Sequence, residues 1–311
     1  MKFPVPSTPR SLRCTVLVAL SAGFLLLTGM QYYLARNFLT QQLLEIESDQ
    51  AAGHLRSARQ SVEVLHEDLV ATAADWAHWD DTYAFVSNRE PSYLQENLTV
   101  DTFRRLHLDV LIVVDQHGRT LYAKSRQGDE VPLQDAPPEL IALGESAARQ
   151  GSDPAVSGLV ATSAGTFLIS SQAVRDSAAI FEPKGRLMMG RSLSTNVALS
   201  INRMGAVPVI VEPIGADHLQ SQPAGDDALR RLPDGSMLFV SADGIDGHTL
   251  LNDISGKPAA VLHLRMDRPL QATLVQARSY LLLATLAIGL AFCVVAIVVF
   301  ELRLIAPIEK L

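Results

Sequence analysis

Two long uncharged apolar segments lie near the two ends of this 311-residue chain. The first extends from about Cys14 to Tyr33, and the second extends from Ser279 to Phe300. A helix rises about 1.5 Å per residue, so about 20 residues are enough to cross a hydrocarbon core of about 30 Å. A buried helix of a soluble protein is the alternative, but it rarely stays uncharged over such a length. We therefore expect transmembrane helices at residues 14–34 and 279–300.

Basic residues on the outer flanks of both segments predict the orientation: Lys2, Arg10 and Arg13 before the first, and Arg303 and Lys310 after the second. Positive flanks favour the cytoplasmic side of a membrane. We therefore expect a cytoplasmic tail at residues 1–13, a periplasmic domain at residues 35–278 and a cytoplasmic end at residues 301–311. This topology places the chain in the lipid bilayer of a bacterial inner membrane. A cleaved signal peptide is the alternative for the first segment, but no small-residue cleavage site cleanly follows the apolar run.

The charge and the cysteines restrict what the outer domain can do. The chain has a formal net charge of −7. Residues 1–34 carry +3 and residues 279–311 carry no net charge, so residues 35–278 carry −10. An acidic surface argues against a nucleic-acid partner. Both cysteines, Cys14 and Cys293, lie in the apolar segments, so about 240 residues must build their core without a disulfide.

Residues 36–88 are predicted to form one long helix. Residues at alternating spacings of three and four form a heptad seam along it: Leu55, Ala58, Val62, Leu65, Leu69, Thr72 and Trp76. Such a seam can join two copies of the chain, and it can also pack on the chain's own domain. Both can hold along different stretches, and we expect a homodimer on this pattern.

Short strands and turns follow the long helix. Leu108–Asp115 and Arg119–Ala123 are predicted to form a hairpin, followed by a helix at about Glu139–Arg149. Three further strands are predicted at residues 155–162, 165–174 and 186–193. We expect an α+β core at about residues 55–205, with a five-stranded antiparallel sheet in the order of a PAS-like or Cache-like sensor fold.

A smaller β unit close to the membrane is predicted at about residues 206–270. Four segments in it have strand patterns: Val207–Pro213, Ser236–Ala242, Gly247–Asn252 and Ala259–Met266. Ser194–Asn202 is predicted to begin a helix with Ser194 as its cap. The polar stretch Gln220–Asp227 is predicted to be a loop.

The segment Asp75–Phe85, DWAHWDDTYAF, is the most distinctive local feature and contains both tryptophans of the chain. Rings beside carboxylates can form a ligand cage, through stacking, cation–π contact and pairing with an amine. The alternative is structural, with the rings holding the helix on the sheet and the acids bonding backbone amides. The candidate ligand-binding residues are Trp76, Trp79, Asp80, Asp81, Tyr83, Asn97 and Arg104.

This segment resembles the signature of the fourth family of CHASE domains, extracytoplasmic sensors associated with cyclases and histidine kinases. The resemblance covers roughly residues 55–270, and six further segments contribute to it: Tyr93–Leu98, Thr102-Phe103, Leu108–Gly118, Gly190–Leu193, Leu250–Pro258 and Leu264–Arg268. It implies a domain that senses a small extracytoplasmic ligand or a periplasmic protein and that has no catalytic residue and no cofactor. In such proteins a HAMP linker usually follows, and then a diguanylate cyclase, a cyclic-di-GMP phosphodiesterase or a histidine kinase.

The last residues, 301–311, are similar to the first turns of a HAMP helix, and Pro307 and Leu311 are the candidate signal-relay positions. No GGDEF-like, EAL-like or kinase sequence is present in the chain. We therefore expect the input half of a receptor whose output is cyclic-di-GMP turnover. The alternatives are the input half of a histidine kinase or chemoreceptor, or a membrane-anchored module that docks a periplasmic protein.

The polar residues do not favour an enzyme in the outer domain. The eight histidines have no spacing typical of metal ligands, and no Gly-x-Ser-x-Gly motif is present. We therefore expect neither a metal site nor hydrolase activity.

Overall fold

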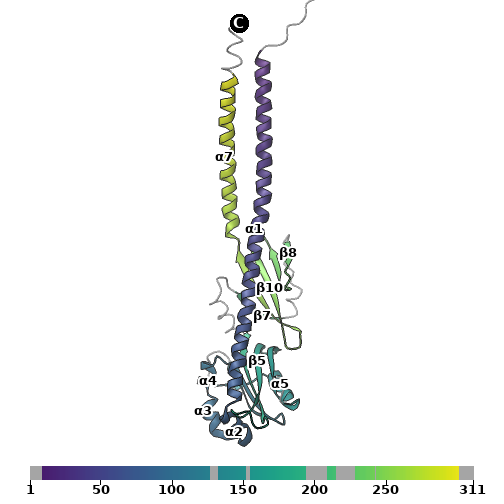
Figure 1. Ribbon diagram of the computed structural model, residues 1–311, viewed down its shortest axis with the longest axis vertical. Coiled ribbons are helices and arrows are strands. Elements are labelled where there is room, and N and C mark those ends of the chain that lie inside the picture. The colour runs from purple at the N-terminus through teal and green to yellow at the C-terminus, as the bar shows by residue number, and fades with distance from the viewer. Residues whose placement is uncertain are drawn as a thin grey trace, which may run out of the picture. The chain divides into compact units, whose positions relative to one another are not determined.

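The computed structural model describes residues 9–126, 132–151, 155–193, 209–214, 228–241 and 243–300. The chain divides into two compact units. One unit consists of Met1–Ser48 and Arg268–Leu311, and the other consists of Asp49–Asp267. The fold is α+β, as predicted, and the second unit contains two antiparallel sheets (Figure 1).

The first unit contains the beginning of helix α1 (Pro9–Ala77) and helix α7 (Pro269–Phe300). A Cβ atom added at Gly289 of α7 would overlap the ring of Phe24 of α1, so the two helices are in close contact at this level. Within the part of the chain that the structure describes, no helix is both long enough and apolar enough to cross a membrane. The predicted HAMP-like end, with Pro307 and Leu311, lies outside the described residues.

The larger sheet of the second unit has six strands in the order β3-β2-β1-β6-β5-β4, all antiparallel. Its strands are β1 (Val110–Asp115), β2 (Thr120–Ser125), β3 (Gln134–Asp135), β4 (Val156–Thr162), β5 (Gly165–Val174) and β6 (Gly185–Ser192). The five predicted strands are confirmed in place and in PAS-like or Cache-like order. The two-residue strand β3 is an addition at the edge beside β2.

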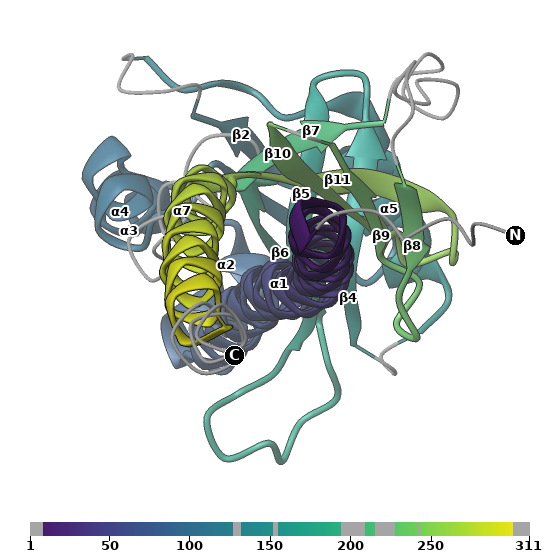
Figure 2. The same cartoon turned by 90° about the horizontal axis from the view of Figure 1, so that it is seen from above.

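Helices cover both faces of this sheet, so the central strand β1 is buried at every position (Figures 1 and 2). Helix α5 (Pro138–Arg149) packs on one face, where Leu140 joins Ile112 and Met188 in the core. Three short helices lie on the opposite side: α2 (Asp80–Asn88), α3 (Pro91–Asn97) and α4 (Val100–Arg105). A strand covered on both faces needs a continuous apolar run, which the sequence Val-Leu-Ile-Val-Val supplies.

The prediction of one helix from residue 36 to residue 88 is wrong at its end, because α1 stops at Ala77 and α2 begins at Asp80. Trp79 between them has an extended backbone, with φ −75° and ψ 136°. A contact from the residue after β5 stabilises the break, since the backbone N–H of Arg175 donates to the carbonyl of Ala77 at 3.1 Å. The break therefore places Trp76 and Tyr83 on two separate helices.

The heptad seam of α1 is occupied by the chain's own second unit. Leu55, Ala58, Val62, Leu69 and Trp76 are all buried there. Leu55, for example, lies so close to Gly247 that a Cβ atom at this glycine would be 2.9 Å from its Cδ1. Between residues 55 and 76 the seam therefore packs within one chain, which is the second of the two uses that the heptad pattern allows. The homodimer stays a prediction.

The smaller sheet has five antiparallel strands in the order β7-β11-β10-β9-β8. They are β7 (Val209–Pro213), β8 (Ala228–Arg231), β9 (Met237–Val240), β10 (Gly244–Asn252) and β11 (Pro258–Asp267). The four predicted strands are confirmed, and β8 is an additional edge strand paired with β9. The helix predicted at Ser194–Asn202 and the loop predicted at Gln220–Asp227 lie outside the described residues.

Candidate functional site

The two tryptophans meet at the break between α1 and α2. Their rings stack with centroids 4.6 Å apart and an interplanar angle of 21°. Trp76 is buried, whereas Trp79 is 37% exposed. Stacking adds to the apolar burial of Trp76, so the pair fixes the direction in which α2 leaves α1.

Asp80 and Tyr83 contact the loop that connects β5 to β6. The carboxylate of Asp80 accepts hydrogen bonds from the backbone N–H and the hydroxyl of Ser177, at 2.9 Å and 3.0 Å. The ring of Tyr83 stacks against Phe181, with centroids 6.4 Å apart. Both contacts hold the loop against α2, which is the structural role that the sequence left open. The ligand-cage role of these residues stays a prediction.

Asp81 and Asn97 line a separate small cavity of about 130 Å³ between α2 and α3, together with Glu90, Tyr93 and Glu96. The hydroxyl groups of Tyr93 and Thr82 share a hydrogen bond of 2.7 Å, and burial raises the pKa of Tyr93. The residues that line this cavity therefore include three acidic side chains and a tyrosine whose hydroxyl is bonded to Thr82.

Arg104 belongs to none of these three groups. It is exposed on α4 and pairs with Asp101 of the same helix at 2.9 Å. The seven residues predicted as one ligand site therefore form four separate groups of contacts on the domain.

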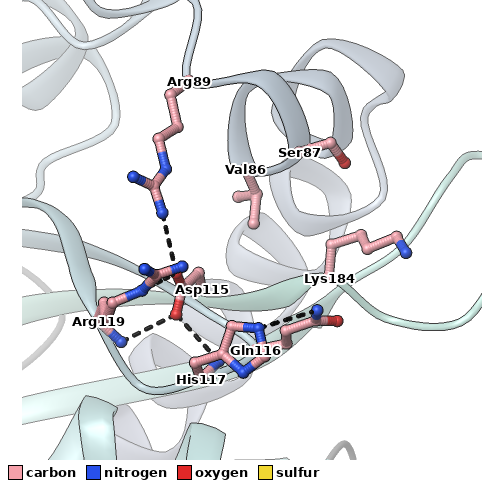
Figure 3. A pocket seen from close by; sticks show the side chains of 8 residues that line it. All are labelled: Val86, Ser87, Arg89, Asp115, Gln116, His117, Arg119 and Lys184. Carbon is pink, nitrogen blue, oxygen red and sulfur yellow. Dashed lines mark hydrogen bonds and ion pairs between the residues drawn. The ribbon is translucent and has the colours of Figure 1, made fainter.

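A further pocket, which the sequence did not predict, lies at the far end of α2 and is lined by basic side chains (Figure 3). Its volume is about 220 Å³, and its charged residues are Arg89, Asp115, Arg119 and Lys184. Arg89 caps the C-terminus of α2, Asp115 ends β1, Arg119 lies in the β1–β2 turn, and Lys184 precedes β6. Three separate segments of the chain thus converge on one pocket.

Asp115 is the anchor of this pocket. Its Oδ1 accepts the backbone N–H groups of His117 and Arg119, both at 2.9 Å. Its Oδ2 accepts from Nε of Arg119 at 2.7 Å and from Nη2 of Arg89 at 3.3 Å. Figure 3 shows both guanidinium groups reaching this one carboxylate from different sides. The side chain of Asp115 is only 6% exposed, so its charge is held by these four donors.

Three of the four donors set the pKa of Asp115. Burial alone would raise it, but the backbone N–H and guanidinium of Arg119 and the N–H of His117 outweigh burial and lower the pKa of Asp115 below its ordinary value. A carboxyl group whose pKa is lower in the folded than in the unfolded protein stabilises the fold above its unfolded pKa. That stabilisation is lost as the pH falls through the folded pKa.

We therefore expect Asp115→Asn to destabilise the protein by about 1–3 kcal/mol at pH 7, because buried donors lose a charged acceptor. The difference from the wild type should shrink as the pH falls below about 4, because the unfolded chain then takes up a proton that the folded wild-type carboxylate, with its lower pKa, does not. Urea unfolding followed by circular dichroism at several pH values measures both. A difference that stays constant down to pH 3 would contradict the assignment.

Comparison with known proteins identifies the domain. Residues 65–211 match the family model of the CHASE4 domain. This segment is similar to the CHASE4 domain family. The CHASE4 match contains the tryptophan pair, the anchor Asp115 and every strand of the larger sheet. The resemblance drawn from the Asp75–Phe85 signature is thereby confirmed.

The relative and the solved structures to which this chain is similar are signalling proteins. The chain is 24% identical over 261 residues to the methanogenesis regulatory histidine kinase FilI of Methanothrix harundinacea (strain 6Ac), covering 79% of this chain. It spans only 28% of the length of that relative. Among solved structures, the extracellular domain of vpHK1S-Z8 matches with a TM-score of 0.46 and 10% identity, over 76% of this chain and 96% of the other. The periplasmic domain of Vibrio cholerae LuxQ matches with a TM-score of 0.41 and 14% identity, over 71% of this chain and 98% of the other.

Proposed function

We propose that this chain is the sensory input part of a membrane-bound receptor. The CHASE4 match over residues 65–211 carries the proposal, because it covers the sheet and the helices that a ligand or partner would contact. The chain itself contributes no catalytic residue in this proposal. It changes the activity of a cytoplasmic output module by changing its own conformation.

We infer a two-pass topology, with helices at residues 14–34 and 279–300 in the membrane and residues 35–278 in the periplasm. The uncharged apolar sequences and the basic outer flanks support it. The contact of Gly289 with the ring of Phe24 also supports it, since a glycine lets two helices approach closely. A small relative movement of these helices, in a homodimer, would carry the signal inward.

For the output, a histidine kinase is the proposal that the similarity to FilI favours. Control of cyclic-di-GMP turnover is the alternative derived from the sequence signature. In either case the ligand must bind two conformations of the receptor with different affinities, because only then can it shift their populations.

The test is a chimera of residues 1–311 with the cytoplasmic part of a histidine kinase of known activity, reconstituted in lipid vesicles. We expect a panel of small metabolites to include one that changes autophosphorylation severalfold from the periplasmic side. A matched chimera that lacks residues 65–211 should not respond. If both chimeras behave alike with every compound and with periplasmic extract, the chain is not a sensory input.

Docking of a periplasmic protein is a second candidate function, and one observation favours it. Ile180 and Phe181, in the β5–β6 loop, are 76% and 61% exposed. The carboxylate of Asp176 holds this loop by accepting hydrogen bonds from the backbone N–H groups of both residues. The Phe181 bond is the main cause of the low pKa of Asp176. An ordered loop with two exposed apolar side chains is a suitable anchor for a protein partner.

A further inference from the structure

We propose that the pocket lined by Arg89, Arg119 and Lys184 binds a small oxyanion, such as a short carboxylic acid or inorganic phosphate. The proposal rests on the proposed sensory function and names the ligand class for one site in it. The shared chemistry of these ligands is two or more anionic oxygens at a spacing that a guanidinium group can contact with two parallel N–H donors.

The charges of the pocket do not balance without a ligand. Three cationic side chains line it, and Asp115 supplies the only carboxylate among its lining residues. Within the part of the chain that the structure describes, no carboxylate pairs with the ammonium group of Lys184, which points away from Asp115 in Figure 3. The pocket therefore has a formal charge of +2, although residues 35–278 carry −10 in total. An anion is the complement that this local excess of positive charge favours.

The arginines keep donors that Asp115 does not use. Among the described contacts of Asp115, each guanidinium donates through one nitrogen only, Nη2 of Arg89 and Nε of Arg119. Both side chains are more than half exposed, at 53% and 61%, so their other N–H groups can reach a ligand in the pocket. Asp115 meanwhile holds the two groups in place by accepting backbone N–H groups on its other oxygen. The carboxylate thus positions the arginines and leaves them able to bind.

The backbone conformation of Arg89 also helps to place its side chain in the pocket. Arg89 has φ 58° and ψ 38°, a left-handed conformation that is uncommon for a residue other than glycine or asparagine. Glycine at this helix end would adopt it at lower cost. The conformation ends α2 with a hydrogen bond from the N–H of Arg89 to the carbonyl of Phe85 at 2.7 Å, and the side chain then reaches Asp115.

The size of the pocket limits the ligand. About 220 Å³ is below the range of roughly 300–1,000 Å³ typical of sites for larger organic ligands. A two- to four-carbon carboxylate or a phosphate ion fits this space. Because α2, the β1–β2 turn and the start of β6 all contribute to the wall, a bound anion would link three segments of the CHASE4 domain.

The test uses the full chain, purified in mild detergent, with sodium phosphate, acetate and succinate as the probes. Each is titrated against sodium chloride at matched ionic strength while the unfolding temperature is recorded. We expect at least one oxyanion to raise the unfolding temperature saturably, with a Kd in the millimolar range or below. The order of phosphate, acetate and succinate separates a phosphate site from a carboxylate site. If none of the three stabilises the protein beyond chloride, the proposal is wrong.

Two variants and one control make the result specific. Arg89→Gln and Lys184→Gln should each raise the Kd by about tenfold, because each removes one charged donor. Arg230→Gln is the matched control, since it removes an exposed arginine that pairs with Asp49 outside the pocket, and it should leave the Kd unchanged. Equal binding by Arg89→Gln and the wild type would overturn the site.

The outcomes for the site and for the sensory function can be told apart. If no anion stabilises the protein but the kinase chimera responds to a metabolite, only this site is rejected. If an anion binds but the chimera responds to nothing, the sensory function is rejected.

Discussion

Replacing Arg268 by glutamine is expected to destabilise the first unit by about 3–5 kcal/mol, because it leaves the carboxylate of Glu47 buried without its charged partner. Nε of Arg268 lies 2.7 Å from Oε2 of Glu47, and the two side chains are 7% and 3% exposed. The other oxygen of Glu47 is buried and has no hydrogen-bond partner among the described residues. The guanidinium is therefore the main compensation for a buried charge. Thermal and urea unfolding of the full chain in detergent measure the loss.

A second ion pair of α1 provides the control. Arg230 lies 4.0 Å from Asp49, but both side chains are exposed, at 45% and 69%. Arg230→Gln should cost less than about 1 kcal/mol, because solvent screens an exposed pair. The double variant Glu47→Gln with Arg268→Gln should cost much less than the sum of its two single variants, since it leaves no buried charge. Additive single effects, or a cost of Arg268→Gln equal to that of Arg230→Gln, would contradict the assignment.

The position of this pair gives it a functional meaning under the proposed topology. Arg268 is the only residue between the end of β11 at Asp267 and the start of α7 at Pro269. Glu47 belongs to α1, so the pair ties the entering helix to the beginning of the leaving helix within one unit. In the proposed receptor, a conformational change in the periplasmic domain would have to pass through the helix ends that this ion pair connects. The double variant should therefore also weaken the coupling of ligand to kinase activity in the chimera.

The sheets could be predicted from the sequence because their signals are local. Apolar runs bounded by turn residues set β1, β4, β5 and β6 to within about two residues of the structure. The edge strands β3 and β8 were missed for a physical reason, since they have two and four residues and depend on pairing with a neighbour. The apolar pattern within such short segments carries no comparable signal.

The site could be predicted only in part, because long-range contacts build it. Neither glycine nor proline marks the break after Ala77, which Arg175 and Ser177 stabilise from about 100 residues further along the chain. Arg89 is 26 residues from Asp115 in sequence, and Lys184 is 69 residues from it. Only the fold of the larger sheet and α2 brings these charges to one pocket. The turn Asp115-Gln-His-Gly-Arg119 was the one local signal, and it predicts a hairpin and not a basic pocket.

Trp76→Ala is expected to destabilise the second unit by about 3–5 kcal/mol, whereas Trp79→Ala should cost much less, about 1–2 kcal/mol. The difference follows from burial, because Trp76 is 9% exposed and Trp79 is 37% exposed. Loss of either ring also removes the stacking contact at 4.6 Å, which contributes about 0.5–1.5 kcal/mol. Urea unfolding followed by far-ultraviolet circular dichroism measures both variants.

The same pair of variants decides between the two roles that the sequence left open for the tryptophans. If the rings are structural, ligand responses of the chimera should persist in Trp79→Ala once the protein is kept below its unfolding temperature. If Trp79 forms part of a ligand cage, its response should fall by about tenfold or more while stability changes little. Trp79→Phe is the control, because it retains a ring that can stack on Trp76. Equal stability losses for Trp76→Ala and Trp79→Ala would contradict the burial argument, since the exposed ring should matter less to folding than the buried one.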